Sequence, residues 1–315
     1  MTATADPDPL DIAIAASPIS QFEVDFENRR RRMRIGWAIG TVLFLIVFAL
    51  TSWIGDFFKV TQVTMQDGSR EWRWIISAGI PRLGEFIEQT IPIVRWDTLG
   101  ADLGNWFWRW KIWLELLFET ILIAFMATVL GVIGGFVLSF PASRNLAPNK
   151  SVLWITRRYL EIARTVPELV WALIFVFCFS VGPMAGVLAI GLHATGALGK
   201  LYSEVNENID MRPLEGVKAA GGSWFDQIRY GAVPQVLPNI ISYTLLRFEI
   251  NVRASSILGY VGAGGLGQEF RIAMSFQEYT DLSALFVIIF VTVMIIDYGS
   301  EKLRHRVIGM EERTS

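Results

Sequence analysis

Four polar residues lie within one long apolar stretch in the C-terminal part of the chain. They are Arg247, Glu249, Asn251 and Arg253. Ionisable side chains are costly inside a membrane, so their presence in such a stretch indicates a functional role. A guanidinium group matches the oxygens of an oxyanion in a bidentate geometry. The pattern therefore predicts a path along which an oxyanion could pass.

Pairing decides which arginine is available to such an anion. On a helix, Glu249 and Arg253 are four residues apart with the acid first, which is the order that favours an ion pair on one face. Arg247 is then left with Asn251, which is neutral, and we predict that Arg247 meets the anion. The competing interpretation is a structural polar network. We favour it for Glu249 and Arg253 and weigh it equally for Arg247.

The rest of the chain shows no pattern typical of catalysis. Its two histidines are His193 and His305, its single cysteine is Cys178, and no metal-ligand spacing is present. We favour a structural role for His193, as a hydrogen-bonding partner of a neighbouring helix, and for Glu168. The glycine-rich residues 262–267 lack the Lys-Ser or Lys-Thr of a phosphate-binding loop, so we expect a tight turn on the outer face. The sequence predicts no catalytic residue, metal or cofactor, and any energy from ATP must come from a partner.

Composition places these residues in a membrane protein. Apolar residues make up 52% and charged residues 18% of the 315 residues, and the mean hydropathy is +0.41. That is too apolar for a soluble domain of this size. The net charge of -2 gives no reason to expect nucleic acid as a partner. Many of the twelve tryptophans lie near the ends of apolar runs, as in an interfacial aromatic belt.

Six apolar stretches are candidates to cross the lipid bilayer, which takes about 20 residues. They are residues 35–54, 112–140, 165–181, 184–198, 237–260 and 282–296. Lys and Arg occur in every segment that then lies inside, so we predict six transmembrane helices with both termini in the cytoplasm. In the second stretch, Ala127, Gly131, Gly135 and Ser139 repeat at every fourth position. Such small residues let helices approach closely, and we favour packing inside one subunit over a dimer interface.

A polar interval separates the fourth and fifth stretches and is centred on residues 215–221. Pro213 stands where the first turn of a helix tolerates proline. Gly221 can end that helix, and Ser223 can cap a second helix that opens at Trp224. The interval therefore predicts a helix, a glycine break and a second helix at the membrane surface.

This interval resembles the cytoplasmic signature of the membrane subunits of ABC importers: Glu-Ala-Ala, three residues, Gly, nine residues, an aliphatic residue, any residue, Leu and Pro. The sequence departs from it at the two Ala places and the aliphatic place, which hold Gly216, Val217 and Gly231. The resemblance implies a helical hairpin that docks into a cleft on an ATPase subunit. Its candidate coupling residues are Glu215, Gly216, Ala219, Ala220, Gly221, Val233 and Pro234. An ordinary solvated linker is the alternative that we disfavour.

Several stretches are similar to the permease subunits of phosphonate importers. They are residues 164–175, 182–189, 193–200, 247–253 and 257–267. The resemblance covers most of the chain after residue 119. It implies an all-α membrane protein with the type I ABC importer permease fold in a bacterial inner membrane. It also implies a homodimer of this subunit, two copies of an ATP-binding subunit, and a binding protein that delivers phosphonate or a related phosphorus oxyanion.

These observations predict four regions. An acidic and then Arg-rich cytoplasmic tail takes residues 1–34, and the acidic part, residues 1–28, is expected to be mostly disordered or to lie on the surface. The first span and an external segment take residues 35–111, where an amphipathic surface helix and a partly ordered loop are equally supported. The permease core takes residues 112–298 with coupling helices at 203–235, and a cytoplasmic tail takes residues 299–315.

Three alternatives remain open at this point. Within the same class, the subunit could serve another solute, such as phosphite, methionine or glycine betaine. A secondary transporter commonly shows an internal repeat, which we do not find in the sequence. A membrane receptor or scaffold would need neither the coupling interval nor charges within a span.

Overall fold

A single long helix, α2 (Pro18–Ile54), carries the arginine cluster and the first apolar stretch. The computed structural model describes residues 18–55, 59–64 and 70–311. It divides into two units, Met1–Ile87 and Glu88–Ser315. In the first unit, strands β1 (Val60–Thr64) and β2 (Arg70–Trp74) pair in antiparallel fashion. Helix α3 (Ile75–Thr90) begins directly after β2.

The first unit corrects the sequence analysis in two places. The two-stranded sheet was not predicted. All other regular secondary structure among the described residues is helical. The predicted acidic tail is also helical from Pro18 onward and continues into α2 without a break; residues 1–17 lie outside the described part. Helix α3 supports the amphipathic-helix alternative for residues 55–111, with Ile80, Leu83 and Ile87 exposed.

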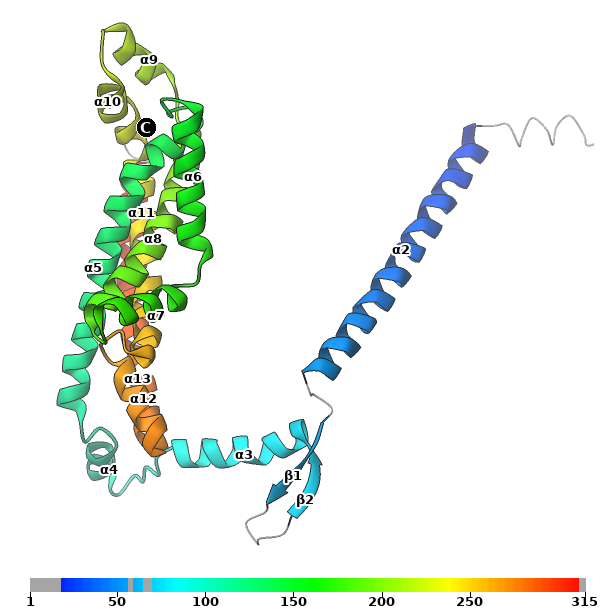
Figure 1. Ribbon diagram of the computed structural model, residues 1–315, viewed down its shortest axis with the longest axis vertical. Coiled ribbons are helices and arrows are strands. Elements are labelled where there is room, and N and C mark those ends of the chain that lie inside the picture. Colours follow the sequence, from blue (N-terminus) through cyan, green and yellow to red (C-terminus); the bar gives the residue numbers. More distant parts are fainter. Residues whose placement is uncertain (1–17, 56–58, 65–69, 312–315) are drawn as a thin grey trace, which may run out of the picture. The chain divides into compact units, whose positions relative to one another are not determined.

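The second unit contains the region predicted as the permease core. Its elements are α4 (Leu99–Trp106), α5 (Trp110–Ala142), α6 (Lys150–Thr165), α7 (Glu168–Phe179), α8 (Pro183–Glu207), α9 (Arg212–Ala219), α10 (Trp224–Asp226), the π-helix η1 (Gln227–Ala232), α11 (Val233–Leu258), the 3-10 turn η2 (Gly259–Val261), α12 (Gly267–Phe276) and α13 (Tyr279–Glu311). Helices α5, α8, α11 and α13 run side by side along the core (Figure 1). Helices α4 and α12 were not predicted.

Not all six predicted spans can be recognised from the helices. Among the described residues, four helical segments are long and apolar enough to cross a membrane: Phe26–Ile54, Trp110–Ala142, Pro183–Glu207 and Tyr279–Arg306. The bent pair α6 and α7 adds a fifth if it counts as one span. Helix α11 has 26 residues but is not in that group. An all-helical membrane core is therefore confirmed, whereas six spans remain a prediction.

The small residues of α5 pack against α8. A Cβ atom at Gly131 would lie 2.5 Å from Cβ of Ala194, and one at Gly135 would lie 2.9 Å from the amide nitrogen of Gly199. Neither position has room for a side chain, because the two backbones are in contact there. The preferred interpretation of this pattern, tight packing inside one subunit, is confirmed.

The glycine-rich residues 262–267 form the expected tight turn. Gly262, Gly264 and Gly265 all have positive φ, a conformation that L-residues with side chains rarely adopt. The turn is fixed to α5 because the backbone N–H of Gly265 donates to Glu119 and that of Leu266 donates to Oγ1 of Thr120, at 3.3 and 2.8 Å. It therefore joins α11 to α12 as a firmly held corner.

The third predicted span begins at a sharp bend in the chain. The chain bends by 89° between α6 and α7, at Val166 and Pro167. Helix α6 lies between the second and third predicted stretches and was not predicted. Pro167 has no N–H to donate to the carbonyl of Ala163, four residues earlier. The indole N–H of Trp171 donates to that carbonyl instead, at 3.3 Å. Nδ1 of His193 lies 3.2 Å from the carbonyl oxygen of Val166, which confirms that His193 bonds a neighbouring helix.

Replacing Trp171 by Phe tests whether this hydrogen bond stabilises the bend. Phe keeps the ring that stacks on Phe175 but removes the donor, which leaves the Ala163 carbonyl unpaired at a cost of about 1–3 kcal/mol. We expect a lower melting temperature for the purified subunit. Trp96→Phe is the matched control, since Trp96 is 94% exposed. Equal melting temperatures for the two variants would contradict the proposed role of the indole.

Candidate functional site

The interval between α8 and α11 forms the predicted helical hairpin. Helix α9 begins with Pro213 in its first turn, and Gly221 reverses the chain with φ of +84°. Ser223 then caps α10, accepting a hydrogen bond from the backbone N–H of Asp226, while the Asp226 side chain accepts one from the backbone N–H of Ser223. Hydrogen bonds from the side chain and backbone of Ser223 lower the pKa of Asp226. The helix, glycine break and second helix are thus confirmed.

The signature residues lie mostly on the outside of this hairpin. Val233 is half-buried, whereas the others are exposed: Glu215, Gly216, Ala219, Ala220, Gly221 and Pro234. The inside is held by Leu214, which packs with Ile228 and Ala232. A Cβ atom at Gly231 would lie 2.8 Å from Cγ of Leu214. Leu214 therefore fills the space of the expected aliphatic residue, which explains why glycine stands at that place.

Two side chains that the sequence analysis missed hold the hairpin on the core. The indole N–H of Trp224 donates to the carbonyl of Leu146 at 2.7 Å. The side chain of Gln235 accepts from the backbone N–H of Asp210 at 2.9 Å and donates to the carbonyls of Asp210 and Gly231 at 3.1 and 2.7 Å. The first bond ties the second helix of the hairpin to the connection between α5 and α6, and the bonds of Gln235 join the start of the hairpin to the first turn of α11.

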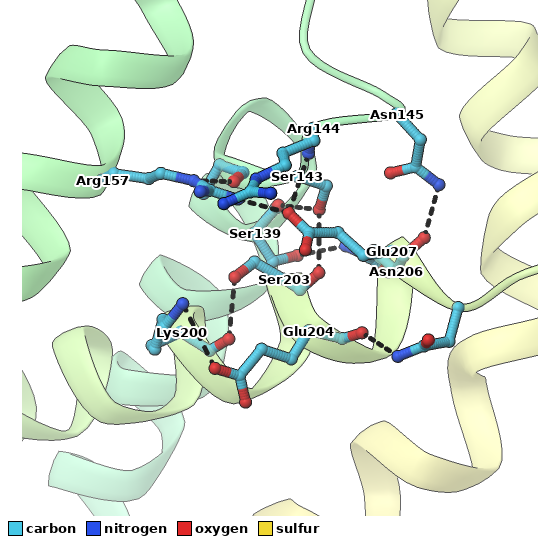
Figure 2. A network of polar contacts seen from close by, with 12 residues as sticks. Ser139, Ser143, Arg144, Asn145, Arg157, Lys200, Ser203, Glu204, Asn206 and Glu207 are labelled. Carbon is cyan, nitrogen blue, oxygen red and sulfur yellow. Dashed lines mark hydrogen bonds and ion pairs between the residues drawn. The ribbon is translucent and has the colours of Figure 1, made fainter.

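A polar network ties together the helix ends beside the hairpin (Figure 2). Glu207, at the end of α8, forms an ion pair with Arg157 of α6 and accepts a hydrogen bond from the backbone N–H of Arg144. The side chain of Asn206 donates to Oγ of Ser139 on α5 at 3.1 Å, and the backbone carbonyl of Asn206 accepts from the side chain of Asn145 at 2.8 Å. These contacts join α5, α6 and α8 beside the hairpin.

The candidate path residues on α11 have different surroundings. Arg253 and Glu249 form the predicted ion pair. Asn251 is fully buried and donates to Oγ1 of Thr128 at 2.9 Å, so it links α11 to α5. The expectation that Arg247 has only a neutral neighbour is wrong. Nη2 of Arg247 lies 3.8 Å from a carboxylate oxygen of Glu168, a residue 79 positions earlier on α7.

Residues 127–298 match the protein family described as the binding-protein-dependent transport system inner membrane component. The match spans more than half of the chain. The chain belongs to this family. It is a multi-pass membrane protein and a permease subunit of an ABC importer, and the resemblance inferred from its motifs is confirmed.

Individual members of the family show the same relationship. This family member is 34% identical to a putative phosphite transport system permease protein of Stutzerimonas stutzeri, over 74% of this chain and 78% of that protein. It is 45% identical to a putative cryptic phosphonate transport system permease protein of Escherichia coli K12, over 38% of this chain and 97% of that one. The fold matches an inward-facing MetNI methionine ABC transporter with a TM-score of 0.55 and 18% identity, over 63% of this chain and 97% of the other.

Proposed function

We propose that this permease subunit forms the path for a phosphorus oxyanion, phosphite or a phosphonate, delivered by a substrate-binding protein. The observation that carries the proposal is the similarity to permeases named for phosphite and phosphonate transport. A buried arginine on α11 adds chemical support, because an anion that crosses a low-dielectric layer needs positive charge along its route.

Reconstitution tests the substrate class. The subunit would be placed in proteoliposomes with an ATP-binding subunit and a binding protein from the same system, and ATP-dependent uptake would be measured. We expect uptake of phosphite or methylphosphonate, and none of methionine or glycine betaine. Uptake of methionine or glycine betaine alone would assign the subunit to another substrate class.

The partners follow from the same proposal. We infer that the exposed side of the hairpin, with Glu215, Gly216, Ala219, Ala220, Gly221, Val233 and Pro234, docks on an ATP-binding subunit, two copies of which serve a homodimer of this chain. Two-fold symmetry is the commonest arrangement of such assemblies. In this proposal α6 with α7 and α11 complete a six-span topology with both termini in the cytoplasm. Arg247, Glu249, Asn251 and Arg253 lie along or beside the path.

Gly221→Val tests the coupling role of the hairpin. Valine at φ of +84° strains the backbone by about 1–3 kcal/mol, although no atom lies within 4 Å of its Cβ position. We expect ATP hydrolysis to continue while uptake per ATP falls severalfold, or the ATP-binding subunit to dissociate. Gly221→Asn should reduce uptake per ATP less than the valine variant does, because asparagine tolerates this conformation. Normal coupling in the valine variant would refute the docking proposal.

A further inference from the structure

Arg247 is held by an ion pair that leaves its Nε and Nη2 donors unused. The 3.8 Å between Nη2 and the Glu168 oxygen is too long for a hydrogen bond. Nε and Nη2 of Arg247 are both buried, and neither has a hydrogen-bond partner among the described residues. The Arg109–Glu269 pair of the same core is different, because its atoms meet at 2.8 Å in a normal hydrogen bond. The charge of Arg247 is therefore balanced, whereas its donors are not satisfied.

The site lies where three helices meet at the bend. Glu168 is in the first turn of α7, directly after Pro167, and Arg247 projects from α11. His193 of α8 lies within electrostatic range of both and bonds the carbonyl of Val166 at the bend. The Arg247 side chain is 11% exposed, and that of Glu168 is 28% exposed. Glu168 is thus the more accessible member of the pair.

We propose that Glu168 is an internal competitor for the transported anion. This inference rests on the proposed function, since it assigns an affinity-setting residue to the same path. An oxyanion that enters displaces the Glu168 carboxylate and accepts hydrogen bonds from the unused donors of Arg247. A tetrahedral oxyanion suits this because its oxygens match the planar fork of a guanidinium group. When the anion leaves, Glu168 balances the arginine again.

This exchange keeps the site weak. Without a carboxylate nearby, Arg247 would be an uncompensated charge inside the membrane, which is strongly unfavourable, and it would hold an anion tightly. With Glu168 present, each anion must first replace a charge that is already there. Binding and release therefore become a near-balanced exchange, which suits a subunit that must pass its substrate on.

The test measures anion binding to the purified permease complex in lipid nanodiscs. Phosphite is the probe, and sulfate is a second tetrahedral oxyanion. Glu168→Gln should tighten phosphite binding about tenfold, which is about 1.4 kcal/mol, and should lower both KM and kcat for uptake. Glu161→Gln is the matched control: it removes an acid on α6 that pairs with Arg158 and should bind like the wild type. The double variant Glu168→Gln with Arg247→Gln should not show this increase in phosphite affinity.

The outcomes separate this inference from the proposed function. Unchanged or weaker binding by Glu168→Gln, or a gain that persists without Arg247, overturns the competitor role. If Glu168→Gln does not assemble, Glu168→Asp replaces it, since its carboxylate is withdrawn by one methylene; tighter binding supports the inference and wild-type binding overturns it. If the wild type takes up no phosphorus oxyanion, the proposed function fails. An Arg247-dependent gain in sulfate binding would still support the role of Glu168.

Discussion

Leucine in place of Gly135 is expected to abolish accumulation of the folded subunit. The Cβ atom alone would meet the amide nitrogen of Gly199 at 2.9 Å and Cβ of Leu198 at 3.0 Å. Leucine adds three further carbons where the α5 and α8 backbones touch. Overpacking of this kind costs about 1–3 kcal/mol and sometimes more, and here neither backbone can withdraw without separating the two helices. The measurement is the amount of subunit in membranes and its elution as an assembled complex.

Gly299→Leu is the matched control for this prediction. Gly299 also lies in an apolar helix, α13, but no atom lies within 4 Å of its Cβ position. Both variants make the same change in hydrophobicity and helix propensity, so the difference between them isolates the contact with α8. If the two variants accumulate equally, the close approach of α5 and α8 does not determine stability.

The second large effect concerns the two arginines of α11. Arg247→Ala should reduce uptake at least tenfold, because the path loses its positive charge. Assembly and binding-protein affinity should remain intact, because the side chain of Glu168 that loses its partner is 28% exposed, whereas that of Glu249 is 13% exposed. Arg253→Ala should instead reduce the yield of complex. Without Arg253, Glu249 loses its ion-pair partner. It also faces the acid Asp297, which lines the same cavity of about 280 Å³ between α11 and α13.

Uptake normalised to assembled complex separates these two roles. Normal uptake by Arg247→Ala would remove this residue from the path. A fully assembled Arg253→Ala complex that does not transport would transfer the role to Arg253.

Features that depend on residues close together in the chain were predicted correctly from the sequence. The break at Gly221 and the cap at Ser223 depend on residues within a few positions of one another, so their types and spacing were sufficient. The small-residue repeat of α5 was equally readable because a helix repeats its face every few residues. In each case the physical cause lies within one or two turns of the backbone.

Long-range partners were not readable from the sequence. Glu168 balances Arg247 although the two residues are far apart in the chain, and nothing in either segment specifies the other. Leu214 fills the space that Gly231 leaves open. The glycine departs from the family signature, but Leu214 compensates for the missing aliphatic side chain. The third apolar stretch was placed from residue 165, next to the bend, but the angle at Pro167 was hidden because hydrophobicity does not report the direction of a helix.

That bend has a consequence for how the chain enters the membrane during synthesis. Helix α7 has 12 residues and spans about 18 Å, well short of the hydrocarbon layer of about 30 Å. Helix α6 contains Arg157, Arg158 and Arg164, and each arginine opposes insertion of an isolated helix by about 2.5–3.5 kcal/mol at its centre. Neither half can therefore serve as an independent stop-transfer signal. We therefore expect the pair to enter the membrane together with α8, against which both helices pack.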